Sequence, residues 1–171
     1  VEAGYKVKAL EVSSRRTKVL RDNCKRVNLT PTIINENFLD FKEKETFDCI
    51  LIDAPCSGSG IVQKKPEILI AKKSLKDLVL KQNLMLSHAK KMLKSGGYLI
   101  YSVCSILSNE GEIQVNNFLK ENHNFSTISP FEDLKRFTAK KNSKYFLTTP
   151  DKYNSHGGID GFFIACLRKN H

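Results

Sequence analysis

Two short, almost continuous apolar runs constrain the fold most, and each ends in a cysteine followed by a serine. Residues 50–57 read ILIDAPCS and residues 99–105 read LIYSVCS. Such runs are typical of parallel strands buried on both faces of an α/β sheet, whose carboxyl ends collect ligands and reactive groups. If the two strands are neighbours, about 4.8 Å apart, the thiols of Cys56 and Cys104 face one crevice. The carboxylate of Asp53 accompanies them.

Strand-like and helix-like segments alternate along the whole chain. The predicted helices are Ser14–Val27, capped by Ser13, then Ser74–Leu93, stopped by Gly96 and Gly97, and one that opens at Ser108 or Asn109. The predicted strands are Lys6–Val12, Thr32–Asn35, Phe47–Asp53, Tyr98–Val103, Thr127–Ser129, Tyr145–Thr148 and Phe162–Leu167. This alternation predicts an α/β protein with a doubly wound sheet.

The charge of the chain favours a polyanionic partner. Its 171 residues include 28 Lys and Arg against 18 Asp and Glu, a formal net charge of +10. An excess of this size is typical of proteins that bind nucleic acid through a basic surface patch. Lysine-rich soluble proteins are also common, so the charge alone leaves both interpretations open.

The cysteines indicate a reducing compartment. The five cysteines are odd in number, sparsely spread and without CxxC spacing, which argues against a disulfide framework and against a zinc site. Neither a signal peptide nor an apolar run of membrane-spanning length is visible in the sequence. We therefore expect a cytoplasmic protein that binds no metal and no membrane.

Residues 53–60 (DAPCSGSG) followed by residues 101–105 (YSVCS) closely resemble the Sun (Fmu) family of RNA cytosine-C5 methyltransferases, which includes the bacterial enzymes that methylate cytosine in small-subunit ribosomal RNA. Residues 96–101 (GGYLIY) resemble the family's approach to its second cysteine, and residues 160–165 (DGFFIA) its final strand. The resemblance covers nearly the whole chain. It implies that residues 1–171 are the C-terminal part of a catalytic domain with a Rossmann-like S-adenosylmethionine-dependent methyltransferase sheet.

The resemblance also implies a role for each reactive side chain. Cys104 is expected to be the nucleophile that adds to C6 of cytosine, which activates C5 toward a methyl group. Cys56 is expected to assist loss of the C5 proton and release of Cys104. Asp53 is expected to hold the edge of the base. Because the reactive form is a thiolate, we expect positive surroundings to lower the pKa of at least one thiol. Single-stranded or loop RNA, of 16S ribosomal RNA in particular, is the implied substrate.

S-adenosylmethionine is the implied cofactor, with Glu11, Asn37 and Asp53 as its predicted binding residues. Glu11 ends the first predicted strand, where an acidic residue commonly binds a ribose hydroxyl pair. The chain departs from the family pattern at Asn37, where an acidic residue is usual, and at Val103, where a threonine is usual. It also lacks the family's first strand and Gly-rich loop, so we expect residues 1–171 alone to bind the cofactor poorly.

Two alternatives stay open at this stage. One is a non-catalytic RNA-binding or subunit-like remnant of the fold, which the missing Gly-rich loop would explain. The other is a thiol redox protein. The two cysteines argue against it, because they lie 48 positions apart on separate predicted strands.

Four further residues are predicted to contact the substrate. Gly58 and Gly60 are expected to let the backbone approach the ribose-phosphate of the substrate, and Lys64 and Lys65 are expected to contact phosphate.

Overall fold

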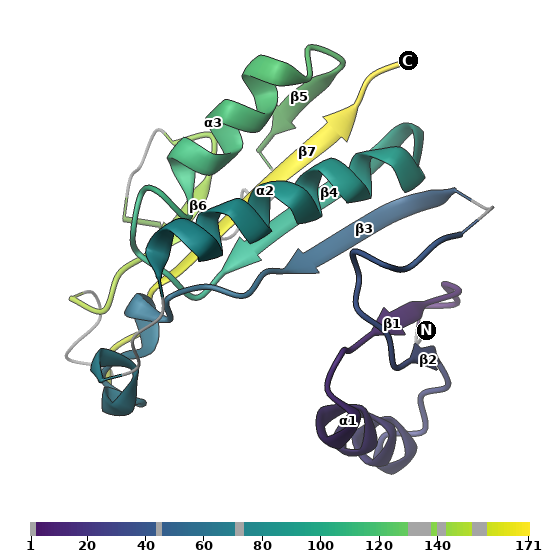
Figure 1. Cartoon of the computed structure of the whole chain (residues 1–171), viewed down its shortest axis with the longest axis horizontal. Coiled ribbons are helices and arrows are strands. Elements are labelled where there is room, and N and C mark those ends of the chain that lie inside the picture. Colours follow the sequence, from purple (N-terminus) through teal and green to yellow (C-terminus); the bar gives the residue numbers. More distant parts are fainter. Residues whose placement is uncertain (1–2, 44–45, 71–73, 130–137, 140–142, 152–156) are drawn as a thin grey trace. The chain divides into compact units, whose positions relative to one another are not determined.

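The computed structural model divides the chain into two compact units, residues 1–44 and 45–171. It describes residues 3–43, 46–70, 74–129, 138–139, 143–151 and 157–171 (Figure 1). Most of residues 130–144, and residues 152–156, lie outside these ranges.

The first unit is a strand–helix–strand motif. Strand β1 (Lys8–Leu10) pairs in parallel with β2 (Thr32–Ile34), and helix α1 (Ser14–Arg26) connects them. The hydroxyl of Ser13 accepts a hydrogen bond from the Arg16 backbone N–H at 3.4 Å, so Ser13 caps α1 as predicted. The buried Thr17 hydroxyl donates to the backbone oxygens of Glu11 and Ser13, which ties the first turn of α1 to the end of β1.

The second unit holds a five-stranded sheet in the order β3–β4–β7–β5, with β6 also paired to β7. The strands are β3 (Phe47–Asp53), β4 (Leu93–Val103), β5 (Phe125–Ile128), β6 (Phe146–Thr148) and β7 (Phe162–Lys169). Strands β3 and β4 are parallel, and β7 runs antiparallel to β4, β5 and β6. The α/β fold predicted from the alternating pattern is confirmed.

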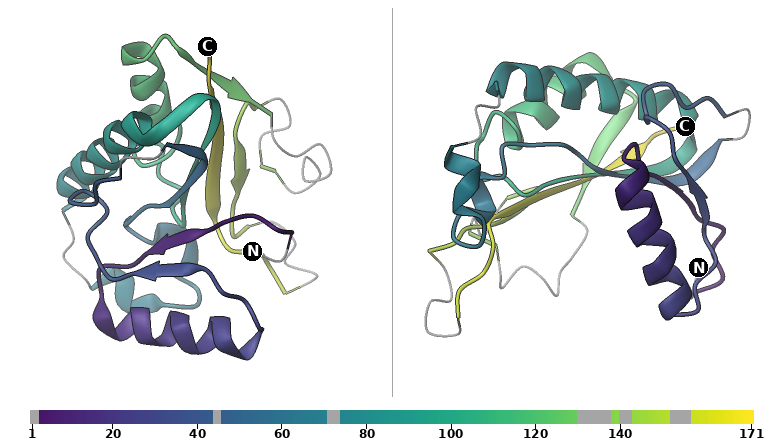
Figure 2. Two further views of the ribbon diagram at one scale, coloured as in Figure 1. Left: turned by 90° about the vertical axis from the view of Figure 1, so that its right-hand side faces the viewer. Right: turned by 60° about the horizontal axis from the view of Figure 1, so that its bottom comes forward.

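Helices α2 (Leu75–Met92) and α3 (Glu112–Glu121) cover one face of this sheet, as the two views in Figure 2 show. The core lies between helices and sheet, where several side chains are fully buried. They include Leu86, Leu99, Tyr101, Val115 and Phe118. Burial of each large apolar side chain contributes about 1.5–3 kcal/mol to the free energy of folding. This packing holds the ends of β3 and β4 in place.

Strand β3 is less buried than its sequence predicts. Of its seven residues only Ile52 is buried, and Leu51 is 65% exposed. Its apolar pattern had indicated burial on both faces, and that prediction is wrong within this unit. The reason is the position of β3 at the end of the sheet, where β4 pairs with one of its edges and α2 covers one face.

The glycine pair at 96–97 forms a bulge inside β4 and does not end a helix. Helix α2 covers nearly the predicted range Ser74–Leu93 and has Ser74 as its N-cap, and β4 starts directly after it at Leu93. Leu93 pairs with Phe47 and Tyr98 pairs with Cys49, so residues 94–97 stand against Asp48 alone. Gly96 has a φ of +77°, and glycine adopts this left-handed backbone at no steric cost.

Candidate active site at the ends of β3 and β4

The two cysteines of the strand-end motifs are in contact. Because β3 and β4 are parallel neighbours with Asp53 opposite Ser102, the segments that follow them leave the sheet side by side. The sulfur atoms of Cys56 and Cys104 lie 3.3 Å apart. Cys56 is buried and Cys104 is partly exposed. The predicted pairing of neighbouring strands is confirmed, and the two thiols lie together beyond their carboxyl ends. Separation along the sequence therefore gives no argument against a reactive thiol pair.

Backbone contacts fix the segment that carries Cys56. The Gly60 N–H donates to the Cys104 carbonyl oxygen at 3.1 Å, and the Gly161 N–H donates to the Gly60 oxygen at 2.7 Å. A Cβ at Gly60 would lie 2.0 Å from the Gly161 oxygen. Glycine at position 60 therefore allows the backbone of residue 60 to lie against the backbone of residue 161. Whether Gly58 and Gly60 also meet a ribose-phosphate stays a prediction.

The surroundings of Cys56 keep it protonated. Burial, the Cys104 thiol and the Glu110 carboxylate raise its pKa to about 12, against a smaller lowering by the Gly58 backbone. Desolvation and nearby negative charge both disfavour a thiolate. The expectation that positive surroundings make a thiol acidic is therefore wrong for Cys56. A thiolate formed there would be a strong proton acceptor.

This pKa gives a pH-dependent prediction. Only the thiolate is alkylated, so the alkylation rate of Cys56 by iodoacetamide should keep rising from pH 7 to pH 10 without a plateau. An unperturbed cysteine titrates near pH 8.5 and should approach its plateau in this range. Peptide mass spectrometry separates Cys56 from the exposed Cys49. A plateau for Cys56 below pH 9 would contradict the raised pKa.

Asp53 is exposed at the last position of β3, three residues before Cys56 in the chain. Its carboxylate stands at the carboxyl end of the sheet, which is where the sequence predicted it. The strand end thus carries one carboxylate and two thiols.

The other two predicted binding residues belong to the first unit. Glu11 follows β1, and its Oε1 accepts from the Ser13 N–H at 2.8 Å and pairs with Arg16 at 2.9 Å. A carboxylate held at a strand end fits the predicted ribose contact. Asn37 uses both polar atoms locally, because its Nδ2 donates to Asp40 and its Oδ1 accepts from the Leu39 N–H. A hydrogen bond from Asn37 to the adenine of the cofactor would have to use the same two side-chain atoms.

Sequence reasoning missed a buried polar cluster directly behind the thiols. Glu110 is fully buried and bonds to Ser57, which follows Cys56. Glu110 lies in the turn before α3, which begins at Glu112 rather than at Ser108 or Asn109. Within a polar stretch, no periodicity distinguishes a buried glutamate from a solvated one. The only signal is that Glu110 follows the second cysteine motif closely.

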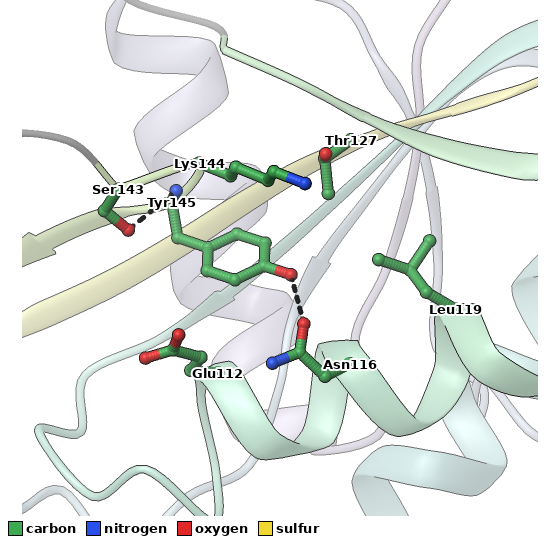
Figure 3. A pocket seen from close by; sticks show the side chains of 7 residues that line it. All are labelled: Glu112, Asn116, Leu119, Thr127, Ser143, Lys144 and Tyr145. Carbon is green, nitrogen blue, oxygen red and sulfur yellow. Dashed lines mark hydrogen bonds between the residues drawn. The ribbon is translucent and has the colours of Figure 1, made fainter.

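The best-defined pocket in the described part of the chain lies elsewhere. It has a volume of about 570 Å³ and is lined by side chains from α3, β5 and the segment before β6. Figure 3 shows the Tyr145 hydroxyl, which donates to Asn116 Oδ1 at 2.7 Å. No predicted site residue lines this pocket. The case for an active site therefore rests on the thiol pair and its chemistry, and not on the shape of the pocket.

The described residues contain neither a metal-binding cluster nor a membrane-spanning helix. No group of three or more His, Cys, Asp or Glu side chains there could hold a metal ion. No helix in the described ranges is both long enough and apolar enough to cross a membrane.

Lys64 has a partner within the protein. Its ammonium group lies 2.8 Å from the Asp160 carboxylate, although the Lys64 side chain is 70% exposed. An exposed ion pair of this kind is worth little, so the predicted contact to phosphate would have to replace it.

Known proteins resemble the chain over nearly its full length. It is 31% identical to ribosomal RNA small subunit methyltransferase B of Shewanella oneidensis, covering 99% of this chain and 39% of that protein. It is 34% identical to ribosomal RNA small subunit methyltransferase F of Aeromonas salmonicida, covering 95% of this chain and 35% of that protein. The chain thus spans little more than a third of these relatives.

A solved structure and a family model agree with these relatives. A methyltransferase homologue from Pyrococcus horikoshii superposes with a TM-score of 0.74 at 26% identity, over 96% of this chain and 53% of that one. The model of the family described as 16S rRNA methyltransferase RsmB/F matches residues 2–168. Because this match takes in almost every residue, the chain belongs to the RsmB/F family of 16S rRNA methyltransferases, the Sun family that the two cysteine motifs had indicated.

Proposed function

We propose that the protein transfers a methyl group from S-adenosylmethionine to C5 of a cytosine in ribosomal RNA, through a covalent adduct with Cys104. The observation that carries this proposal is the 3.3 Å contact between the Cys56 and Cys104 sulfurs at the ends of two parallel strands. Two thiols and a carboxylate at one strand end suit the covalent activation of a pyrimidine, which needs at least one thiolate nucleophile, and the family is one of rRNA methyltransferases.

Cys104 supplies the nucleophile. Its thiolate forms a bond to C6, and the electron pair of the C5–C6 double bond becomes available at C5 for a new bond to carbon. Bound S-adenosylmethionine supplies an electrophilic methyl group. Once C5 carries the methyl group, loss of the C5 proton to a base restores the double bond and breaks the bond between C6 and the Cys104 sulfur.

Cys56 assists this release. It lies beside the Cys104 sulfur, so it would sit close to a base bound there, and once deprotonated it could take up the C5 proton. Asp53 would hold the base edge and favour protonation at N3. Glu11 fits the ribose hydroxyls of the cofactor, because its carboxylate is fixed at the end of β1. Asn37 would contact the adenine ring.

The position of methylation can be tested directly. RNA labelled with tritium at C5 of cytosine should release tritium to water when protein and S-adenosylmethionine are both present, because the C5 proton leaves in the reaction. In a parallel reaction, unlabelled RNA should gain label at an equal rate from S-adenosylmethionine that carries the label on its methyl group. Methyl transfer without tritium release would overturn methylation at C5. The full-length protein is the form to test, since the relatives are longer than this chain.

RNA binding should be electrostatic and sensitive to salt. With a net charge of +10, lysine and arginine side chains would displace counterions from phosphates, so log Kd should rise linearly with log salt concentration. Filter binding between about 50 and 200 mM salt should show a loss of affinity of about tenfold or more. A flat dependence would contradict an electrostatic RNA surface. It would favour the alternative that the charge only solvates the protein.

A further inference from the structure

The buried carboxylate of Glu110 is bonded on both oxygens. Its Oε1 accepts from the Ser57 N–H at 2.8 Å and from Gln82 Nε2 at 3.1 Å, and its Oε2 accepts from the Ser57 hydroxyl at 2.6 Å. The residue is fully buried. Burying a carboxylate costs several kcal/mol unless its oxygens are satisfied, so a glutamate here needs a reason beyond filling space.

A chain of hydroxyls links this carboxylate to both thiol loops. Ser57 follows Cys56 in the sequence, and Ser105 follows Cys104. The Ser57 and Ser105 hydroxyl oxygens lie 3.3 Å apart, and Ser105 lies 3.0 Å from the Ser59 hydroxyl. The two segments that carry the thiols are therefore joined by side chains as well as by the backbone bond of Gly60.

Glu110 is itself anchored in the core. The hydroxyl of the fully buried Tyr101 donates to its backbone oxygen at 2.7 Å. Gln82, on α2, bonds both to Glu110 and to the Pro55 oxygen at 3.0 Å. These contacts connect α2 and β4 to the turn before α3, so the carboxylate cannot shift without disturbing the rigid part of the unit.

We propose that Glu110 is a positioning residue whose carboxylate holds the Cys56 and Cys104 segments in one geometry and maintains negative charge behind the thiol pair. As a statement about catalysis this rests on the proposed function, since it assumes that these thiols react. Its charge also contributes to the raised pKa of Cys56, after burial and the Cys104 thiol. A purely structural glutamate would fix the fold without affecting thiol acidity.

Two substitutions separate geometry from charge. In Glu110→Gln, the amide oxygen can take the place of Oε1 and the amide nitrogen can donate to the Ser57 hydroxyl, so the three bonds persist without the charge. Glu110→Ala removes both bonds and charge. Glu121→Gln is the matched control, because Glu121 is exposed on the last turn of α3. Ser105→Ala breaks the hydroxyl chain while leaving the Glu110 bonds to Ser57.

The positioning role is tested by the effective concentration of the two thiols. This quantity is measured in the full-length protein from the equilibrium between the Cys56–Cys104 disulfide and glutathione. Glu110→Ala and Ser105→Ala should each lower it by about tenfold, the worth of roughly one hydrogen bond. Glu110→Gln and Glu121→Gln should stay near the wild-type value. If the Glu110→Ala protein does not fold, the effective concentration of the thiols in Ser105→Ala tests the positioning role. A wild-type value in a folded Ser105→Ala protein would overturn the positioning role.

The effect of the Glu110 charge is tested by the pH dependence of the alkylation rate of Cys56. Glu110→Gln should move the profile to lower pH and speed alkylation at pH 8 by about threefold, because removing a nearby negative charge favours the thiolate. An unchanged profile would overturn the electrostatic half of the proposal. These measurements use neither RNA nor cofactor, so failure of the proposed methyl transfer would appear in tritium release and not here.

Discussion

Cys104→Ala is expected to abolish methyl transfer, whereas Cys56→Ala is expected to leave RNA covalently attached to the protein. Without the Cys104 sulfur no bond to C6 forms, and the loss should be at least about 10⁴-fold, as for other nucleophiles. Without Cys56 the bond to C6 still forms, but loss of the C5 proton slows and the adduct accumulates. The 3.3 Å separation of the two sulfurs would let both reach the same base.

Denaturing gel electrophoresis measures the adduct, which should appear as a slower band that survives denaturant in the Cys56→Ala protein. The double variant should show none, because it lacks the nucleophile. Cys49→Ala is the matched control, since Cys49 is exposed on β3 and lies on neither strand-end motif. An adduct from Cys104→Ala and none from Cys56→Ala would exchange the two roles.

The thiol contact could be predicted because it follows from short-range rules. Apolar runs of strand length that end in polar turns indicate parallel strands, and parallel neighbours end at the same edge. The register then places Asp53 opposite Ser102. The capped start of α1 was equally visible, since Ser13 precedes a helical pattern.

What could not be predicted depends on tertiary contacts. Gly96 and Gly97 resemble a helix stop, but β3 pairs with the residues before them and turns them into a bulge. Burial of Glu110 arises from Ser57 and Gln82, which lie 53 and 28 positions away. The raised pKa of Cys56 likewise reflects burial and partners brought by folding. A sequence pattern carries no signal for such long-range partners.

Gly60→Ala is expected to destabilise the second unit strongly. The added Cβ would lie 2.0 Å from the oxygen of Gly161, 2.5 Å from its carbonyl carbon and 2.8 Å from its Cα. These are backbone atoms and cannot rotate away. Moving the segment would break the bonds from Gly60 to Cys104 and from Gly161 to Gly60. We expect a loss of about 3 kcal/mol or more in the free energy of unfolding, at or above the usual cost of overpacking.

Urea unfolding followed by circular dichroism measures this loss, and Gly4→Ala is the control. Gly4 has a φ of +82° but open space around its Cβ position, so its substitution costs only backbone strain of about 1–2 kcal/mol. At Gly60 the cost of an added Cβ comes from the lack of space and not from the backbone φ. The Gly60→Ala protein should also show a lower effective concentration of the Cys56 and Cys104 thiols, because the Gly60 N–H holds the Cys104 carbonyl. If Gly60→Ala unfolds within 1 kcal/mol of the wild type, the close approach of residues 60 and 161 does not support the thiol site.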